Sequence, residues 1–348
     1  MTMSCWSTIA RAQTTSRKIY VANFASDSLS IFRVGSNGNV ASLFTQTKLK
    51  NTDSVGGDAG ILAPTGVALD AQGKIYVAND GVATGSPEQD NVTVYPAGSN
   101  ANVSPIGGSP NYSSPQAIAV GSDGTTYVAN GTGGVQLRGD ISIVPPSLEG
   151  KAKVRMISGT AANDVTRLDD PSGLAVDHDG NLYVVNSGSQ SIAVYGPHAD
   201  GNVPPIRTIS GEKTKLDSPQ GIALNAAGKI YVTNDGGIGP GAADSINVYA
   251  PNTNGNVAPI ATIAGPNTQL KLPQGIAVDS DGKIYVANDG NLEDPAEDAS
   301  RYDDRPRADP ANSITVYPPG SHGNVAPIAR INGPLTGLGH PMGIAVGP

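Results

Sequence analysis

The side chains of this chain that could bind a polar ligand are amides at the two ends of a recurring hairpin pattern. Gln274 precedes an apolar segment at 275–278, and Asn288 ends a second apolar segment at 284–288. Because the two amides lie symmetrically about Asp281 in the intervening turn, we expect them to be cross-strand neighbours. The same spacing recurs in two further hairpins. The candidate ligand-binding amides are Gln116, Gln220, Gln274, Asn130, Asn234 and Asn288.

Two interpretations of these amides are open. Amides offer hydrogen-bond donors and acceptors, so a ring of them could bind a neutral polar ligand such as a glycan or a peptide. Alternatively, each Asn caps the loop that follows it by bonding nearby backbone, as Asn commonly does. An Asn ends the second segment in all six repeats, which favours the capping interpretation for Asn. Three repeats carry Thr65, Ser172 and Met342 in place of Gln, so both interpretations stay open for the glutamines.

Carboxylates gather in the loops next to these amides. Asp80, Asp235 and Asp289 each directly follow a repeat Asn, and we include them among the candidate ligand-binding residues. Calcium takes about 6–8 oxygen ligands, so an acidic cluster could hold Ca²⁺. The segment 289–312 lacks Asp-x-Asp-x-Asp-Gly spacing and contains Arg301, Arg305 and Arg307, which favours a solvated acidic loop over a calcium site. The other acidic residues of these loops are Glu88, Asp90, Asp244, Glu293, Asp294, Glu297, Asp298, Asp303 and Asp304.

Residues for nucleophilic catalysis are sparse. His178, His198 and His322 fall in short predicted turns at one end of the repeats, and His340 falls at the opposite end. We therefore expect neither a His pair nor a Ser–His–Asp set. Carboxylate pairs could still perform acid–base chemistry. The expectation is a non-catalytic binding protein, with a metal-dependent hydrolase or lyase as the alternative.

Short strands must position these residues, because each repeat contains four apolar segments with alternating polarity and no helical period. The second strand of each repeat ends in the Asn at position 23, 79, 130, 186, 234 or 288. Third strands are predicted at 28–33, 91–95, 140–144, 191–195, 245–249 and 313–317. Fourth strands are predicted from Asn39, Asn102, Asn202, Asn256 and Asn324, and at 151–157 in the third repeat. Pro105, Pro205, Pro259 and Pro327 are expected in these outermost edge strands, where a missing N–H is tolerated.

Six units of four strands predict an all-β fold, a six-bladed β-propeller of four-stranded antiparallel blades. The chain opens with only a second strand at 18–23 and closes with only a first strand at 343–346. We therefore expect the C-terminal strand to join the N-terminal blade and close the ring. The propeller would be one domain at 18–348, preceded by a leader or tail at 1–17.

The pattern Pro-x-Gly-Ile-Ala-Val-Asp-x-x-Gly-x-Ile-Tyr-Val-Ala-Asn at 273–288 resembles the NHL-repeat propellers, and the resemblance covers about 18–348. It implies a scaffold that hosts enzymes, adaptors and surface proteins alike. This chain has Asn where the family more often has Asp, and it lacks the Arg-Ile common in the family's third strand. These departures argue against the RNA binding known in some members. Calcium-dependent propeller lactonases typically place a metal-binding Asn after the proline of the first strand, where this chain has Thr, Gln, Ser or Met. Streptogramin lyases, another propeller family, depend on histidines, and this chain is not expected to bring its histidines together.

Composition limits the partners. The formal net charge of −8 provides no basic surface, so nucleic acid and anionic lipid are not expected. No apolar run approaches the roughly 20 residues needed to span a bilayer. Cys5 is the single cysteine, which excludes a disulfide framework. The segment 9–12 before Gln13 has the small-x-small pattern of a signal-peptidase site, so the sequence predicts a secreted or cell-surface protein.

The connections divide the ring into two unlike ends. Short uniform turns at 70–73, 121–124, 177–180, 225–228 and 279–282 define what we call the turn end. Variable loops at 46–64, 80–90, 131–139, 235–244 and 289–312 define the loop end. Because binding is usually built on variable loops over a rigid scaffold, we expect a protein or glycan to bind at the loop end. Unlike ends also permit head-to-tail self-assembly.

Overall fold

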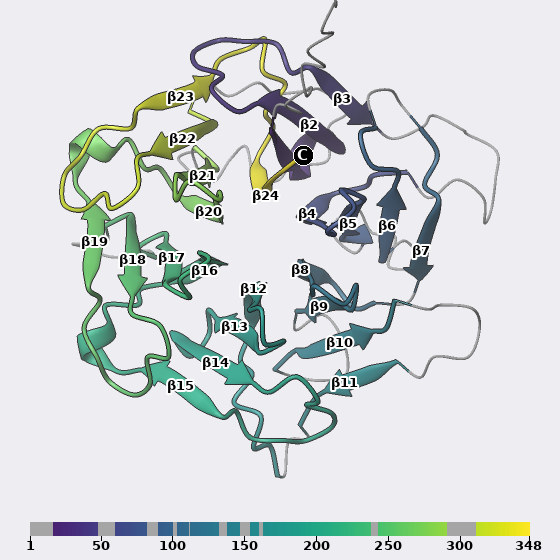
Figure 1. Ribbon diagram of the computed structural model, residues 1–348, viewed down its shortest axis with the longest axis vertical. Helices are drawn as coiled ribbons and strands as arrows, with labels where there is room; N and C mark the ends of the chain where they lie inside the picture. Colours follow the sequence, from purple (N-terminus) through teal and green to yellow (C-terminus); the bar gives the residue numbers. More distant parts are fainter. Residues whose placement is uncertain are drawn as a thin grey trace, which may run out of the picture.

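The computed structural model shows six four-stranded antiparallel sheets arranged as blades around a central channel (Figure 1). It describes residues 17–47, 60–81, 90–99, 103–110, 112–131, 138–146, 154–159, 163–237, 243–290 and 311–348. The predicted six-bladed propeller is confirmed. The leader at 1–16, Cys5 and most of the acidic segment 289–312 lie outside the described residues.

Strands of the same rank occupy the same place in each blade, and their lengths differ by at most one residue. We number the blades 1 to 6 in ring order, starting with the blade that contains both chain ends. The innermost strands are β24 (Pro341–Gly347), β4 (Pro64–Leu69), β8 (Pro115–Val120), β12 (Pro171–Val176), β16 (Pro219–Leu224) and β20 (Pro273–Val278). The second strands are β1 (Lys18–Asn23), β5 (Ile75–Asn79), β9 (Thr126–Asn130), β13 (Leu182–Asn186), β17 (Ile230–Asn234) and β21 (Ile284–Asn288).

The third strands match the predicted segments residue for residue. They are β2 (Ser28–Arg33), β6 (Asn91–Tyr95), β10 (Asp140–Val144), β14 (Ser191–Tyr195), β18 (Ser245–Tyr249) and β22 (Ser313–Tyr317). The outermost strands are β3 (Phe44–Thr47), β7 (Gly107–Pro110), β11 (Arg155–Ile157), β15 (Arg207–Ser210), β19 (Ala261–Ala264) and β23 (Ala329–Asn332). Among the described connections, three 3-10 helices are present: η1 (Phe24–Ser26), η4 (Glu212–Thr214) and η5 (Pro266–Thr268).

The C-terminal strand closes the ring as predicted. β24 pairs antiparallel with β1, with Tyr20 opposite Ala345 and Val21 opposite Ile344. In Figure 1 the yellow β24 lies beside the purple strands of blade 1. Blade 1 is therefore built from the first three strands and the last strand of the propeller.

The hydrophobic core lies between neighbouring blades rather than within one. Val185 and Ile192 of blade 4 belong to one cluster with Ile222 and Ile230 of blade 5, and all four side chains are buried. Burying each such side chain stabilises the fold by roughly 1.5–3 kcal/mol. The β-branched residues that define the repeat thus hold the ring together at the blade junctions.

The outermost strands are shorter than predicted. The expected fourth strand from Asn256 begins in fact at Ala261, and Pro259 lies before β19 rather than in it. The preceding segment bonds to the neighbouring blade instead, because the Gly255 N–H donates to the Thr208 carbonyl at 2.7 Å. Pro105, Pro205 and Pro327 likewise precede β7, β15 and β23. In the third repeat, β11 covers 155–157, and 151–153 lie outside the described residues.

Candidate functional site

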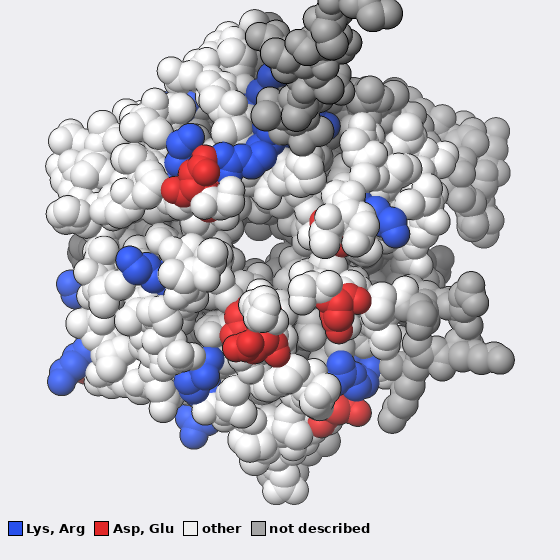
Figure 2. All heavy atoms as spheres, in the orientation of Figure 1, with Lys and Arg blue, Asp and Glu red and all other residues white. Residues whose placement is uncertain are grey.

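A cavity of about 100 Å³ opens in the channel at the loop end, where the innermost strands begin. Figure 2 shows the channel as an opening at the centre of the ring. Its floor is a ring of six aliphatic side chains, one from each blade: Val67, Ile118, Leu174, Ile222, Ile276 and Ile344. Its rim is a second ring, one residue per blade: Thr65, Gln116, Ser172, Gln220, Gln274 and Met342. We call this site the channel mouth.

Gln116 is held at the rim by its amide nitrogen. Its Nε2 donates to the Ser114 carbonyl at 3.2 Å and to the Ser114 hydroxyl at 3.0 Å, and lies 3.5 Å from the Asp80 carboxylate. Asp80 is buried and comes from the preceding blade. Because an ionised carboxylate only accepts, the amide must turn its NH₂ group toward Asp80. Its Oε1 accepts no hydrogen bond from the described residues.

Gln220 is oriented in the same way by a carboxylate of its own blade. Its Nε2 donates to Asp235 Oδ2 at 2.9 Å and to the Ser218 hydroxyl at 3.4 Å. Its Oε1 also accepts no hydrogen bond from the described part of the chain. Burial raises the pKa of nearby Asp244, and the charge of Asp235 raises it further. This side of the rim is therefore rich in oxygen acceptors.

The remaining rim positions divide into two kinds. Gln274 is partly buried, and its amide forms no hydrogen bond with the described residues. Thr65 and Ser172 instead donate across blade junctions, to the carbonyls of Pro115 at 2.6 Å and Pro219 at 3.1 Å. The hydroxyls therefore join blades, whereas the three glutamines leave amide carbonyls at the channel mouth.

The repeat asparagines lie inside the fold. Asn130, Asn234 and Asn288 are 2%, 0% and 0% exposed. Asn234 and Asn288 accept from the backbone N–H groups of Asp217 at 3.1 Å and Lys271 at 3.2 Å. These bonds attach the loop before the innermost strand to the blade, so these two asparagines bond to that loop through their oxygens rather than to the loop that follows them, which the capping interpretation expected.

The predicted cross-strand pairing of Gln274 with Asn288 is wrong by one residue. Pro273 lies opposite Asn288, and the register shifts between Pro273 and Ile276. The same shift occurs between Pro219 and Ile222, with Pro219 opposite Asn234. A β-bulge inserts an extra residue and redirects side chains, so the glutamines face the channel while the asparagines stay in the blade.

Asp289 forms an interaction that the sequence did not indicate. Its Oδ1 lies 2.7 Å from His340 Nδ1, and the two side chains are 12% and 27% exposed. His340 directly precedes Pro341 and has a φ of 48°. The residues before the other five innermost-strand prolines also have positive φ, namely Ala63, Ser114, Asp170, Ser218 and Leu272. His340 lies at the loop end as the sequence predicted, but the left-handed backbone before the proline, which brings it beside Asp289, has no sequence signal of its own.

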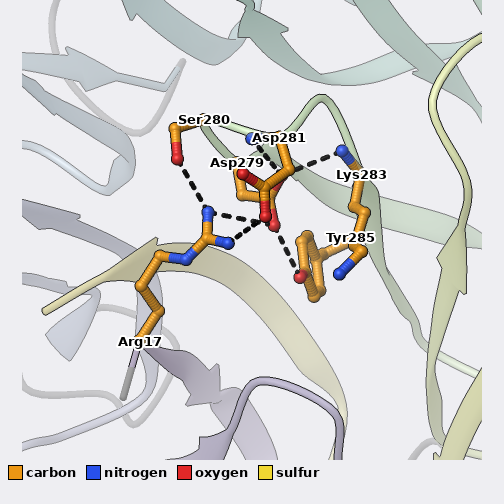
Figure 3. Close-up of polar contacts among 6 residues, drawn as sticks. All are labelled: Arg17, Asp279, Ser280, Asp281, Lys283 and Tyr285. Carbon is orange, nitrogen blue, oxygen red and sulfur yellow. Dashed lines mark hydrogen bonds and ion pairs between the residues drawn. The ribbon is translucent and has the colours of Figure 1, made fainter. Parts of the chain in front are cut away.

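Carboxylates at the turn end are already satisfied. Asp279 accepts from the backbone N–H groups of Asp281 and Lys283 at 2.9 Å and from the Tyr285 hydroxyl at 2.9 Å. Arg17 Nη1 lies 3.3 Å from the same carboxylate, and Arg17 also contacts Ser280 and Asp281 (Figure 3). Asp70 and Asp177 repeat the turn and tyrosine bonds. The turn end uses its acceptors for folding, in contrast to the channel mouth.

Within the described ranges, no group of three or more His, Cys, Asp or Glu side chains is arranged to hold a metal ion. The acidic residues Glu88, Glu293, Asp294, Glu297, Asp298, Asp303 and Asp304 lie outside these ranges. Among the described residues, no helix has the length and apolar character to cross a membrane. The face in Figure 2 carries scattered charges of both signs, without a continuous basic surface.

Comparison with known proteins agrees with this architecture. The profile of the NHL repeat matches residues 168–195, which include β12, β13 and β14. All six blades share the four-stranded antiparallel arrangement of blade 4, so the protein is a six-bladed β-propeller with an NHL repeat in blade 4. No match was found among curated proteins.

Solved structures share the fold across nearly the whole chain. A protein of unknown function from Bacteroides caccae has a TM-score of 0.59 at 11% identity, covering 95% of this chain and 99% of that one. A protein from Lactobacillus plantarum has a TM-score of 0.54 at 11% identity, covering 96% and 99%. A chain of the nidogen/laminin complex has a TM-score of 0.52 at 13% identity, covering 95% and 98%. At these identities the likeness concerns the fold alone.

Proposed function

We propose that this protein is a secreted or cell-surface propeller that binds a protein or a carbohydrate at its loop end without chemistry. The observation that carries the proposal is the channel mouth. There the Oε1 atoms of Gln116, Gln220 and Gln274 accept no hydrogen bond from the described residues, above an open cavity. These acceptors are accessible from the cavity and are not used by the described fold, so a ligand with hydrogen-bond donors could bond to all three.

The alternative is a hydrolase or lyase at the same mouth. The observation in its favour is the position of His340 Nδ1, 2.7 Å from Asp289 Oδ1, because an imidazole beside a carboxylate could supply an acid and a base, although this contact lacks hydrogen-bond geometry. The pair belongs to the loop end, so both functions share one face. Head-to-tail assembly is a further alternative, which sedimentation of the purified protein at increasing concentration tests.

The experiment compares ligand binding by two matched tryptophan variants. Gln274→Trp fills the channel mouth at a side chain that forms no hydrogen bond with the described residues. Ala226→Trp places the same bulk at an exposed position of the turn end. Both proteins and the parent are screened against a glycan array and a displayed peptide library. We expect the parent and Ala226→Trp to bind the same ligands and Gln274→Trp to lose at least tenfold in affinity.

Two results would contradict the proposal. One is a parent protein that binds no member of either collection. The other is the reverse pattern, with Ala226→Trp losing the ligand and Gln274→Trp retaining it, because binding would then lie at the turn end. Turnover of a bound ligand, abolished by His340→Asn, would replace the binding function with the enzymatic alternative.

A further inference from the structure

We propose that the channel mouth binds a protein segment that inserts one aliphatic side chain into the cavity and places basic residues at the rim. The inference rests on the proposed binding function and names its ligand class. It follows from three properties of the mouth: the size of the cavity, the composition of its floor, and the hydrogen-bonding character of its rim.

The cavity is too small for a whole ligand. Pockets for small molecules measure about 300–1,000 Å³, whereas this cavity is about 100 Å³. An apolar cavity of about 150 Å³ is enough for benzene, so the cavity matches one branched aliphatic side chain. The mouth therefore recognises a group that projects from a larger partner.

The floor selects an apolar group. It consists of one Val, one Leu and four Ile side chains, of which Ile222, Ile276 and Ile344 are 6–7% exposed. Val and Ile are stiff because they branch at Cβ, so the floor keeps its shape. A sugar hydroxyl placed here would lose its hydrogen bonds to water without replacement. None of the residues that line this cavity is aromatic. The floor thus favours an aliphatic side chain over a sugar ring.

The rim selects hydrogen-bond donors and positive charge. Asp80 and Asp235 lie within 3.5 Å and 2.9 Å of the amide nitrogens of Gln116 and Gln220, which leaves amide oxygens to face a ligand. A peptide supplies backbone N–H donors, and flanking Lys or Arg supplies charge. Complementary charge also raises the association rate with a chain of net charge −8.

The test uses synthetic heptapeptides of the form Gly-Lys-Gly-X-Gly-Lys-Gly, with X as Ile, Leu, Phe, Asn or Gly. Their dissociation constants are measured by fluorescence anisotropy against the intact protein. We expect the Ile and Leu peptides to bind at least tenfold more tightly than the Asn and Gly peptides. Replacing both Lys residues by Glu should remove binding, and raising the salt concentration should weaken the Lys peptides.

A change of specificity separates recognition from a structural effect. Ile222→Ala enlarges the floor, so the preference should move from Ile toward Phe, which loss of folding does not produce. Because Ile222 also packs in the core, Gln274→Leu is a second variant. It removes an amide that makes no hydrogen bond in the described fold, and it should weaken all Lys-flanked peptides while thermal stability stays unchanged.

The outcomes distinguish the inference from the function on which it rests. Binding of glycans at the mouth, with no preference among the peptides, would overturn the inference and leave the binding function intact. Equal affinities for Ile and Asn peptides, or an Ile222→Ala protein with unchanged preference, would also overturn it. Absence of any ligand for the parent protein would contradict both.

Discussion

Arg17 and Asp279 join the first described residue of the chain to a turn of blade 6, with Arg17 Nη1 3.3 Å from the carboxylate (Figure 3). Arg17 precedes β1 of blade 1, so this contact crosses the junction that β24 also closes. The Asp279 side chain is 1% exposed and that of Arg17 is 32% exposed. The ring is therefore closed twice, by a strand and by a side chain.

The Arg17 contact predicts a small and salt-dependent contribution to stability. Arg17→Met should lower the free energy of unfolding by at most about 1 kcal/mol, because partly exposed ion pairs contribute little and Asp279 keeps its backbone donors. Urea titrations at low and high ionic strength should show the loss shrinking with salt. Arg33→Met, at an exposed residue of β2, is the control and should have no effect. A loss of equal size at both salt concentrations would contradict the ion-pair account.

Removal of residues 341–348 should destabilise the whole ring. The deletion removes β24, leaves β1 without its inner partner and exposes the neighbouring β4 and β20. We expect the free energy of unfolding to fall by several kcal/mol, which is comparable with the typical total stability of a protein, about 5–15 kcal/mol. Thermal unfolding followed by circular dichroism measures it. A truncated protein that melts at the parental temperature would show that β24 does not close the ring.

Gly275 should not tolerate a side chain. A Cβ there would lie 2.3 Å from the Met342 carbonyl of the neighbouring inner strand. Gly275→Ala must push these strands apart, and such overpacking costs about 1–3 kcal/mol. Gly196→Ala is the matched control, because a Cβ there meets nothing within 4 Å. The midpoint of urea unfolding should fall for the first variant alone. Equal midpoints would mean that the innermost strands are less closely packed than described.

Asp140→Asn should stabilise the protein at neutral pH. Burial raises the pKa of the Asp140 carboxyl, although the amide of Asn130, which donates to it at 2.7 Å, opposes the shift. The folded state then binds the proton more tightly than the unfolded state, so stability falls as pH rises through the folded pKa. At pH 7 the Asn variant avoids the cost of burying an ionised carboxylate. We therefore expect its free energy of unfolding to be higher by on the order of 1 kcal/mol.

Blade 2 already has the residue that the Asp140→Asn variant introduces into blade 3. Its Asn91 occupies the position equivalent to Asp140 and accepts from Asn79 at 2.9 Å. The gain should shrink as the pH falls toward the unperturbed Asp pKa of about 3.9, and it should vanish about one pH unit below it, where Asp140 is neutral in both states. The measurement is the unfolding free energy from pH 3 to pH 8. A gain that is constant across this range would rule out the ionisation of Asp140 as its cause.

The architecture could be predicted because the repeat encodes it six times. Alternating apolar residues placed the third strands at their observed bounds, and the split first blade predicted the pairing of β24 with β1. The lengths of the outermost strands were overestimated because Pro259 and its equivalents belong to a segment before the strand, and around Pro259 this segment bonds to the preceding blade. Those bonds join residues far apart in sequence, such as Gly255 and Thr208.

The candidate site could be predicted only in part. Gln116, Gln220 and Gln274 were found from their places in the hairpins, but the bulge after Pro273 shifted their expected partner by one residue. The approach of Asp80 to Gln116 crosses a blade junction, so its geometry depends on how the blades pack. The pair of Asp289 with His340 depends on a left-handed residue before a proline, for which sequence offers no signal.

Oxidation of Met342 tests the central assignment, that the ligand occupies the channel mouth, most directly. Met342 lines the mouth, whereas Met156 is 40% exposed on the outermost strand of blade 3. Both thioethers react with peroxide to an extent set largely by access. The rates are measured by mass spectrometry with and without a saturating ligand selected from the arrays. The account predicts that the ligand slows oxidation of Met342 at least several-fold and leaves Met156 unchanged. An unchanged rate at Met342 under saturation would contradict it.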